Sequence, residues 1–468
     1  MRNLTTESSA SKLYQDAEQY ILSLITGPPS PDPETPPETI RQRAVERLDQ
    51  TRAFLDHLGN PQNAYRSIHI GGTSGKGSTA TFIASILTSA GFRTGLHVSP
   101  YLQVATEKLV VDNRLASATR YRDLVQNIAE KAEAWESAGN PPLTYGEFWV
   151  ALTFYYFAEE NVDVGVIEVG AGGRFDLTNV IEPEVVAITS IGLDHVVTLG
   201  DTVEEIAWHK AGIIKPGVRA ITAVGEAGPL AVIQAEATEV GADLIRVEPG
   251  KDFRLESTSA KGTRFVDNLS GKTFQVALPG QFQAANAATA IAVTRAFDAE
   301  AATNDAIETG LAAARFPGRM EVVQSEPLVM LDGAHNPQKI EGLAADIREI
   351  TGNRRVIAVF GVLDSKNHSG MIDALAPHVD VLVATSPKVY AKPAVNAEEI
   401  ARYARRVIDE VHVESDPLAA VARALDLASN DDAVIVTGSL YLVGNVRERW
   451  FPTEQILSQG TMWPSDRD

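Results

Sequence analysis

Short apolar runs alternate with amphipathic segments along most of the chain from residue 67 onward. The runs have the length and the Val, Ile and Leu content of strands that are buried on both faces, whereas the segments between them have the apolar spacing of helices. This alternation predicts a parallel sheet that is covered by helices on both faces. The predicted strands are 67–70, 94–98, 164–169, 185–190 and 219–224, and the predicted helices are 79–90, 121–137, 147–160 and 202–213.

The pattern differs at two places outside this series. Residues 11–24 and 39–59 have helical apolar spacing, and the proline-rich segment 27–37 between them predicts an exposed loop, because proline fits neither a helix interior nor an inner strand. Residues 243–277 form short, partly polar runs with little helical signal. We expect this region to be an antiparallel annex of the sheet.

A second βα series begins after the sequence Phe316-Pro-Gly-Arg-Met320, which interrupts the pattern. Helical spacing at 281–297 and 305–314 precedes it, and the strands predicted after it are 328–331, 355–360, 379–385 and 433–437. We therefore place a domain boundary near residue 320. The predicted fold class is α/β, with a mostly parallel N-terminal domain (1–320) that carries the antiparallel annex, and a smaller Rossmann-like domain (321–468).

Composition narrows the classes of function. The net charge of -20 argues against nucleic acid as a partner, since polyanion binding requires clustered Lys and Arg. The absence of cysteine excludes thiol catalysis, disulfides and Cys-ligated zinc. The first residues lack the apolar core of a signal peptide, and no apolar run reaches the length of a membrane span. We expect a cytoplasmic protein that has no membrane partner.

The segment Gly72-Thr-Ser-Gly-Lys-Gly-Ser-Thr79 lies between a predicted strand and a predicted helix. It departs from the usual phosphate loop, because Gly77 separates Lys76 from Ser78. One interpretation is a glycine-rich turn that serves only chain geometry. The alternative, which the strand–loop–helix context favours, is a phosphate site: backbone N–H groups surround the phosphates, Lys76 contacts the β and γ oxygens, and Ser78 or Thr79 binds Mg²⁺.

This loop resembles the variant phosphate loop of the Mur ligase superfamily, and further motifs resemble the folylpolyglutamate synthase/dihydrofolate synthase family in the same order. The resemblance extends from about Tyr14 to about Arg447. The motifs are Leu143-Thr-Tyr-Gly-Glu-Phe148, Glu168-Val-Gly-Ala-Gly-Gly-Arg-Phe-Asp-Leu-Thr-Asn179, Ile188-Thr-Ser-Ile-Gly-Leu-Asp-His195, His209-Lys-Ala-Gly-Ile213, Leu278-Pro-Gly-Gln-Phe-Gln-Ala-Ala-Asn286, Phe316-Pro-Gly-Arg319, Asp332-Gly-Ala-His-Asn-Pro337 and Gly438-Ser-Leu-Tyr-Leu-Val-Gly444.

The resemblance implies an ATP-dependent ligase that adds L-glutamate to dihydropteroate or a folate. Forming an amide in water is uphill, so ATP first converts the carboxylate into an acyl phosphate, which the amine then attacks. The residues that the resemblance assigns to ATP are Gly72, Thr73, Ser74, Gly75, Lys76, Gly77, Ser78 and Thr79 of the loop, together with Asn286, Arg319, Asp332 and His335. Asp332 alone also fits an ordinary turn.

The resemblance assigns catalysis and metal binding to a small set of residues. The resemblance implies two Mg²⁺ ions held by Ser78, Glu147, His195 and Lys210, with Lys76, His195 and Lys210 as the catalytic residues. Glu147 is also explained as a first-turn glutamate favoured by the helix dipole, and His195 as a structural histidine. In the family the lysine matching Lys210 is typically carbamylated, which makes it an anion.

The resemblance assigns Tyr101, Arg174 and Asp176 to the pteroate or folate substrate, although the loop that contains the latter two also fits a surface turn. Three positions depart from the family pattern: Tyr101 and Phe282 replace histidine, and His209 replaces glutamate.

Two other functions remain open at the level of sequence. The first is a related ligase acting on a cell-wall nucleotide precursor. Such enzymes carry a separate domain before the loop, whereas about 65 residues precede it here, which favours the folate substrate. The second is an ATP-dependent switch protein that makes no product. We expect a monomer, and the sequence does not distinguish dihydropteroate from a reduced folate.

Overall fold

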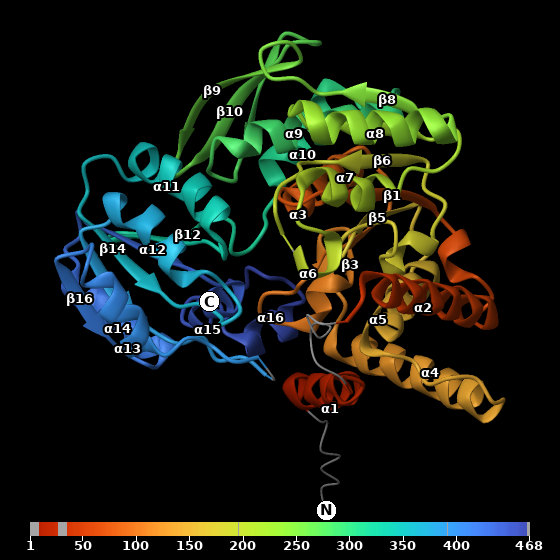
Figure 1. The fold of residues 1–468 in the computed structure, drawn as a ribbon, viewed down its shortest axis with the longest axis horizontal. Helices are drawn as coiled ribbons and strands as arrows, with labels where there is room; N and C mark the ends of the chain where they lie inside the picture. Colours follow the sequence, from red (N-terminus) through yellow and green to blue (C-terminus); the bar gives the residue numbers. More distant parts are fainter. Residues whose placement is uncertain (1–8, 27–34, 195, 391, 466–468) are drawn as a thin grey trace, which may run out of the picture. The chain divides into compact units, whose positions relative to one another are not determined.

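The computed structural model describes residues 9–26, 35–194, 196–390 and 392–465. The chain divides into two compact units, and each contains more than one stretch of sequence (Figure 1). Unit 1 comprises residues 1–252, 285–311 and 454–468, and unit 2 comprises 253–284 and 312–453. The predicted domain boundary near residue 320 stays a prediction; the chain passes from one unit to the other after residues 252, 284, 311 and 453.

Unit 1 is built on an eight-stranded sheet with the strand order β4-β3-β2-β5-β1-β6-β7-β8. In this spatial order, every pair along β2-β5-β1-β6-β7-β8 is parallel. Strand β3 pairs antiparallel with both β2 and β4. The strands are β1 (Arg66–Gly71), β2 (Thr94–His97), β3 (Val110–Val111), β4 (Arg114–Leu115), β5 (Val164–Glu168), β6 (Val185–Ile188), β7 (Arg219–Thr222) and β8 (Asp243–Arg246).

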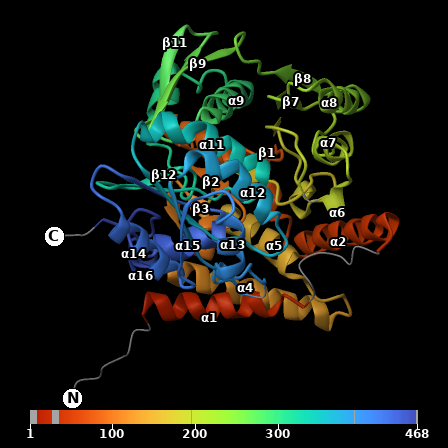
Figure 2. The same ribbon diagram turned by 60° about the vertical axis from the view of Figure 1, so that its left-hand side comes forward.

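Helices pack against this sheet and against one another. In both views α1 lies beside α4, and α8 lies beside β8 (Figures 1 and 2). The helices of unit 1 are α1 (Ala10–Ser23), α2 (Pro37–His57), α3 (Lys76–Ser89), α4 (Ala118–Ser137), α5 (Tyr145–Glu159), α6 (Val196–Leu199), α7 (Val203–Ala211), α8 (Ala227–Val240), α9 (Phe282–Phe297), α10 (Asn304–Ala313) and α16 (Thr453–Gln459), with the short 3-10 helices η1 (Pro61–Asn63), η2 (Ala105–Lys108) and η3 (Leu177–Val180). Helix α9 begins in unit 2 and α10 ends there, while α16 begins one residue before the last stretch of unit 1.

The burial of the elements follows their sequence pattern. β5 is buried at every position, as expected for an inner strand of a parallel sheet. Helix α3 is buried from Gly77 to Leu87, because its apolar and small residues extend around the whole helix and not along one stripe. α3 is therefore an interior helix, and the loop that precedes it is attached to a well-packed support.

Unit 2 contains the other two sheets. A three-stranded antiparallel sheet has the order β11-β10-β9, and a six-stranded sheet has the order β12-β13-β17-β14-β15-β16, in which only β12 is antiparallel to its neighbour. The strands are β9 (Phe253–Ser259), β10 (Gly262–Asp267), β11 (Lys272–Val276), β12 (Glu321–Ser325), β13 (Leu328–Leu331), β14 (Val356–Phe360), β15 (Val381–Ala384), β16 (Glu410–Val413) and β17 (Ala433–Thr437). The helices are α11 (Pro337–Thr351), α12 (His368–Leu375), η4 (Ala376–His378), α13 (Ala397–Ala404), α14 (Pro417–Leu427) and α15 (Leu440–Arg447).

The predicted α/β class, with a mostly parallel sheet, an antiparallel annex and a second βα series, is confirmed. The annex starts later than predicted, because β8 pairs parallel with β7 at the edge of the large sheet. Only β9, β10 and β11 form the antiparallel sheet. The half-polar sequence of β8 is typical of an edge strand, which is why the pattern alone places it in the separate sheet.

Candidate functional site

The carboxyl ends of three neighbouring parallel strands bring the candidate site together. β1 lies between β5 and β6 in the sheet, and the loop 72–75 follows β1 directly. In an open parallel sheet, ligands bind beyond the carboxyl ends of the strands. The segments that follow β5 and β6 are therefore placed beside this loop.

Hydrogen bonds to the segment after β6 fix the shape of the loop. Thr73 N donates to Ser190 O at 2.8 Å, and Ser74 N donates to Ser190 Oγ at 2.9 Å. Thr189 Oγ1 donates to Ser74 O at 2.6 Å, and Thr73 Oγ1 donates to Gly192 O at 3.1 Å. These bonds determine the path of the loop before any ligand binds, which lowers the ordering cost of binding.

Two glycines of the loop have conformations and contacts that exclude a side chain. Gly72 has a φ of 136°, and a Cβ there would lie 2.0 Å from Thr189 Oγ1. Gly75 has a φ of 85°, and its Cβ would lie 2.3 Å from Asn286 Oδ1. Asn286, which the family resemblance assigns to the nucleotide, therefore lies directly against the loop.

Helix α3 begins at Lys76, so the backbone N–H groups of its first turn point toward the loop. Ser78 and Thr79 lie in this turn and are buried. Among the described residues, the Thr79 hydroxyl oxygen has no hydrogen-bond partner. An unpartnered buried hydroxyl at a helix N-terminus agrees with the predicted role of this turn in binding phosphate and a metal ion.

Glu168 is a site residue that the sequence reasoning missed. It is the last residue of β5, its side chain is 6% exposed, and its Oε1 lies 3.8 Å from Lys76 Nζ. Its Oε2 accepts a hydrogen bond from Ser99 N at 2.9 Å. The signal in the sequence was a single carboxylate at the end of an otherwise apolar strand, where parallel sheets present groups to ligands.

The end of α7 also reaches the loop. Lys210 is 4% exposed, and its Nζ donates to Gly72 O at 2.9 Å, which places it beside the loop; its roles in metal binding and catalysis stay predictions. The neighbouring His209 is buried, and burial together with Arg41 and Arg174 lowers its pKa to about 4. His209 is therefore neutral at pH 7 and adds no positive charge next to Lys210.

Glu147, one of the predicted metal ligands, makes hydrogen bonds within its own helix terminus. Glu147 caps α5: its Oε2 accepts from Thr144 N at 2.7 Å, and burial raises its pKa. Its other carboxylate oxygen is buried and has no hydrogen-bond partner among the described residues. In the ranges that the structure describes, no hydrogen bond or ion pair connects Glu147 to the loop 72–79. His195, the other predicted metal ligand, lies outside the described residues.

The three predicted substrate residues have protein partners. Tyr101 donates to Glu18 Oε1 at 2.7 Å. Arg174 pairs with Glu236 at 2.6 Å and stacks on the ring of Trp208, with its guanidinium carbon 4.2 Å from the ring centroid. Asp176 Oδ2 accepts from Ala171 N at 2.8 Å and braces its own loop. Their substrate contacts stay predictions.

The predicted residues of unit 2 form a cluster of their own around the turn 332–336. Asp332 follows β13, is buried, and accepts from Met320 N at 2.9 Å and from Ala334 N at 2.8 Å. Burial raises its pKa, and the nearby Arg319 opposes this shift. His335 is held through both ring nitrogens, by Gly333 O at 2.8 Å and by Lys339 Nζ at 3.0 Å.

Mg²⁺ fits the residues at the loop. Across the described ranges, no group of three or more His, Asp or Glu side chains is arranged to hold a metal. Mg²⁺ does not need such a group, because it is usually held by one or two carboxylates together with substrate phosphates and water. The Glu168 carboxylate and the hydroxyls of Ser78 and Thr79 supply the hard oxygen atoms that this ion prefers.

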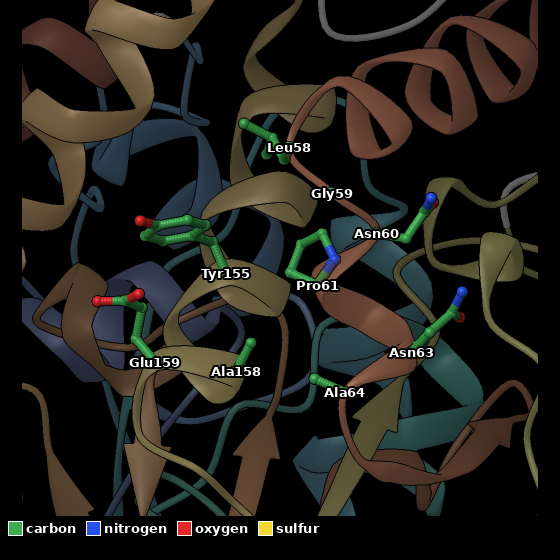
Figure 3. A pocket seen from close by; sticks show the side chains of 9 residues that line it. All are labelled: Leu58, Gly59, Asn60, Pro61, Asn63, Ala64, Tyr155, Ala158 and Glu159. Atoms are coloured by element: carbon green, nitrogen blue, oxygen red, sulfur yellow. The ribbon is translucent and has the colours of Figure 1, made fainter.

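A surface pocket of about 450 Å³ lies elsewhere in unit 1 (Figure 3). It lies between the end of α2, η1 and the side chains of Tyr155, Ala158 and Glu159 on α5. None of the predicted site residues lines it.

Among the described helices, none is both long enough and apolar enough to cross a membrane.

Models of two Mur ligase domains and curated relatives match most of the chain. Residues 70–294 match the Mur ligase middle domain, and residues 318–440 match the Mur ligase glutamate ligase domain. The dihydrofolate synthase/folylpolyglutamate synthase of Bacillus subtilis is 34% identical over 413 residues, which cover 86% of this chain and 94% of that protein.

Two solved structures have the same fold over nearly the whole chain. The folylpolyglutamate synthase of Mycobacterium tuberculosis complexed with ADP has a TM-score of 0.81 and 29% identity, and covers 94% of this chain and 99% of its own. The Escherichia coli FolC in complex with DHPP and ADP has a TM-score of 0.77 and 30% identity, with coverage of 94% and 98%. This chain therefore belongs to the folylpolyglutamate synthase/dihydrofolate synthase family of the Mur ligase superfamily.

Proposed function

We propose that this protein is an ATP-dependent ligase that joins L-glutamate to the carboxylate of dihydropteroate or a folate through an acyl phosphate. The observation that carries the proposal is the loop 72–75, which is fixed by Thr189 and Ser190 and has Lys76, Glu168 and Lys210 beside it. The names of the relatives, and the ADP and DHPP bound in the solved structures, support this substrate class over a cell-wall nucleotide precursor.

In this reaction the loop binds the phosphates of ATP. The backbone N–H groups at the start of α3 and the ammonium of Lys76 stabilise the negative charge that shifts as the γ-phosphoryl group moves to the substrate carboxylate. A bound Mg²⁺ would supply positive charge that offsets the negative charge of the phosphates. We propose that Glu168 and Ser78 hold the ion, and that Glu147 and His195 take part in metal binding as the sequence predicts.

Lys210 has a separate proposed role. As a carbamate it is an anion that positions the metal ions, whereas an ammonium would be repelled by them. At about 4 Å two unit charges interact by about 4 kcal/mol at an effective dielectric constant of 20, which is enough to select the anion when metal is bound. His209 is neutral at pH 7 and therefore adds no positive charge next to Lys210.

For the nucleotide we propose contacts from Asn286, Arg319, Asp332 and His335, and for the pteroate or folate contacts from Tyr101, Arg174 and Asp176. Because the last three already have protein partners, substrate binding must replace or extend those bonds. We also propose that the protein acts in the cytoplasm as a monomer.

The test is ADP release by the purified protein with ATP, Mg²⁺, L-glutamate, and either dihydropteroate or tetrahydrofolate. We expect ADP release to require both glutamate and one of these acceptors. Lys76→Ala should lower kcat by at least about 100-fold, since it removes a charge that stabilises the transition state. Lys131→Ala, on α4 away from the loop, is the matched control and should be unchanged.

Two results would contradict the proposal. Glutamate-independent ADP release would indicate an ATPase and not a ligase. Near-normal turnover by a folded Lys76→Ala protein would show that the loop does not bind the reacting phosphate. Glu168→Gln adds a third arm: it should raise the Mg²⁺ concentration needed for half-maximal activity, and an unchanged magnesium titration would remove Glu168 from the metal site.

A further inference from the structure

His69 is a fully buried histidine on β1, the inner strand that leads into the loop 72–75. It lies between the apolar residues Ile68 and Ile70, and a buried polar group costs free energy unless it is hydrogen-bonded. Its ring reaches η3, where Nε2 lies 2.9 Å from Thr178 Oγ1. Burial lowers the pKa of His69 to about 3, so the imidazole is neutral at pH 7 and carries one N–H group.

The partners of Thr178 show which ring nitrogen carries that hydrogen. A hydroxyl has one hydrogen, and Thr178 Oγ1 donates it to Asp176 Oδ1, since a carboxylate only accepts. Toward His69 the hydroxyl can therefore only accept, so Nε2 carries the hydrogen and donates it. Nδ1 is then unprotonated, and it is buried without a hydrogen-bond partner among the described residues. The result is a directed chain of hydrogen bonds from His69 through Thr178 to Asp176.

This chain fixes one side of the Asp176 carboxylate. Oδ1 accepts from Thr178 N at 3.0 Å as well as from the Thr178 hydroxyl, and Oδ2 accepts from Ala171 N at 2.8 Å. Each carboxylate oxygen has two lone pairs, so within the described part of the chain Oδ1 is fully used and Oδ2 keeps one acceptor position. Asp176 is half-buried, whereas Thr178 and His69 behind it are buried. Oδ2 is therefore the atom that is left to accept from a ligand.

We propose that His69 is a positioning residue for the substrate: through the Thr178 hydroxyl it orients the Asp176 carboxylate, so that Oδ2 accepts a hydrogen bond from an N–H group of the pteroate or folate. This inference rests on the proposed function, because it takes Asp176 to contact that substrate. Donation from Nε2 polarises the Thr178 hydroxyl and strengthens its bond to Asp176, as successive hydrogen bonds in a chain do. Strand β1 then supports the phosphate loop through its end and the substrate loop through His69.

The first experiment measures the binding of dihydropteroate and tetrahydrofolate by calorimetry, together with steady-state kinetics. His69→Leu removes the donor and keeps a buried side chain of similar size. It should raise Kd and KM for the acceptor by about 10-fold, the size expected for one net hydrogen bond, while KM for ATP stays the same. His69→Gln places an amide N–H near the position of Nε2 and should recover most of the affinity. His69→Asn places it near Nδ1 and should not.

A double-mutant cycle tests whether the effect passes along the chain. In an Asp176→Ala background, His69→Leu should cause no further loss of acceptor binding, because it acts only through that carboxylate. Effects of the two changes that multiply would show that His69 acts by another route, and would overturn the inference. Thr178→Val should weaken binding as His69→Leu does. Thr294→Val is its matched control: this buried threonine of α9 bonds to Ala290 O within its own helix, and acceptor binding should be unchanged.

The second experiment depends on neither activity nor substrate. In ¹⁵N-histidine-labelled protein, the His69 signals are identified by their loss in His69→Gln. We expect a protonated Nε2 and an unprotonated Nδ1 at pH 7. A proton on Nδ1 would refute the chain, because the Thr178 hydroxyl would then have to donate to His69 and not to Asp176.

The outcomes separate this inference from the proposed function. If the wild-type protein binds neither dihydropteroate nor tetrahydrofolate, the proposed function fails, and the role of His69 in substrate binding fails with it. If the wild type binds one of them and a folded His69→Leu protein binds it equally well, only this inference fails. Should His69→Leu not fold, Thr178→Val breaks the chain at its next bond, and unchanged acceptor binding by that variant would overturn the inference.

Discussion

Lys108 lies in a cage of aromatic rings within unit 1 and is only 8% exposed. Its Nζ is 4.4 Å from the ring centroid of Trp149, 5.6 Å from that of Tyr145 and 6.0 Å from that of Tyr101. Burial lowers the pKa of Lys108 from its ordinary value of 10.5 to about 8, although the carboxylates of Glu18 and Glu168 oppose this shift. The lowered pKa means that folding favours the neutral amine.

The sign of the effect on stability follows from proton counting. Between pH 8 and pH 10.5 the unfolded chain binds a proton at Lys108 that the folded chain has released, so the free energy of unfolding rises with pH in this window. Below pH 8 both states are protonated, and the folded state bears the full cost of the buried charge. The difference between 10.5 and about 8 corresponds to about 3 kcal/mol.

Lys108→Met removes the ionisable group and keeps a side chain of similar length. We compare the free energy of unfolding of the variant with that of the wild type. The variant's advantage should be larger at pH 7 than at pH 10.5 by up to about 3 kcal/mol. The assay is urea denaturation followed by tryptophan fluorescence, since Trp149 reports directly on the cage, at a series of pH values. Lys12→Met, at an exposed position of α1, is the control and should show no such pH dependence.

A difference between Lys108→Met and the wild type that is the same at pH 7 and pH 10.5 would refute the reasoning. It would show that the ammonium is as well solvated in the folded protein as in the unfolded chain. A difference that grows with pH would mean that the carboxylates and rings stabilise the charge by more than burial costs.

Three further predictions concern single contacts. Gly75→Ala should lower the free energy of unfolding by about 1–3 kcal/mol and weaken ATP binding, because its φ is 85° and the new Cβ meets Asn286; unchanged urea denaturation and ATP titration would contradict this. Arg447→Met should cost about 3–5 kcal/mol in urea denaturation, because Glu321 then remains buried without its partner at 2.8 Å, and adding Glu321→Gln should recover part of the loss; the absence of recovery would contradict the ion-pair explanation. Lys210→Ala should be nearly inactive and partly restored by acetate, and an unmodified lysine in the mass spectrum of active, CO₂-supplied protein would refute the carbamate.

The sequence by itself determined the local framework of the site. The apolar strand, the glycine-rich loop and the helix that follows are adjacent in the chain, so their order predicted β1, the loop 72–75 and α3 without knowledge of the rest. The order of motifs likewise predicted the family and the chemistry. The local elements were predictable because periodicity and glycine conformation act over a few residues, whereas the family was predicted from the resemblance of its motifs.

Tertiary structure alone decided which side chains meet. Lys76 meets Glu168 because β1 and β5, far apart in the sequence, are neighbours in one sheet. Lys210 meets Gly72, and Asn286 meets Gly75, because the helices α7 and α9 pack beside the loop. The same reason explains β8, whose half-polar sequence is compatible with either sheet until its partner β7 is known.

Tertiary structure also decided which polar residues are already engaged. The resemblance assigns Arg174 to the substrate, but Arg174 pairs with Glu236, which lies on α8. The ring of His335 likewise contacts Gly333 O and Lys339 Nζ, which lie at other positions of the turn and of α11. Hydrogen-bond partners and burial set the charge and the donor or acceptor role of such groups, and both arise only when the chain is folded.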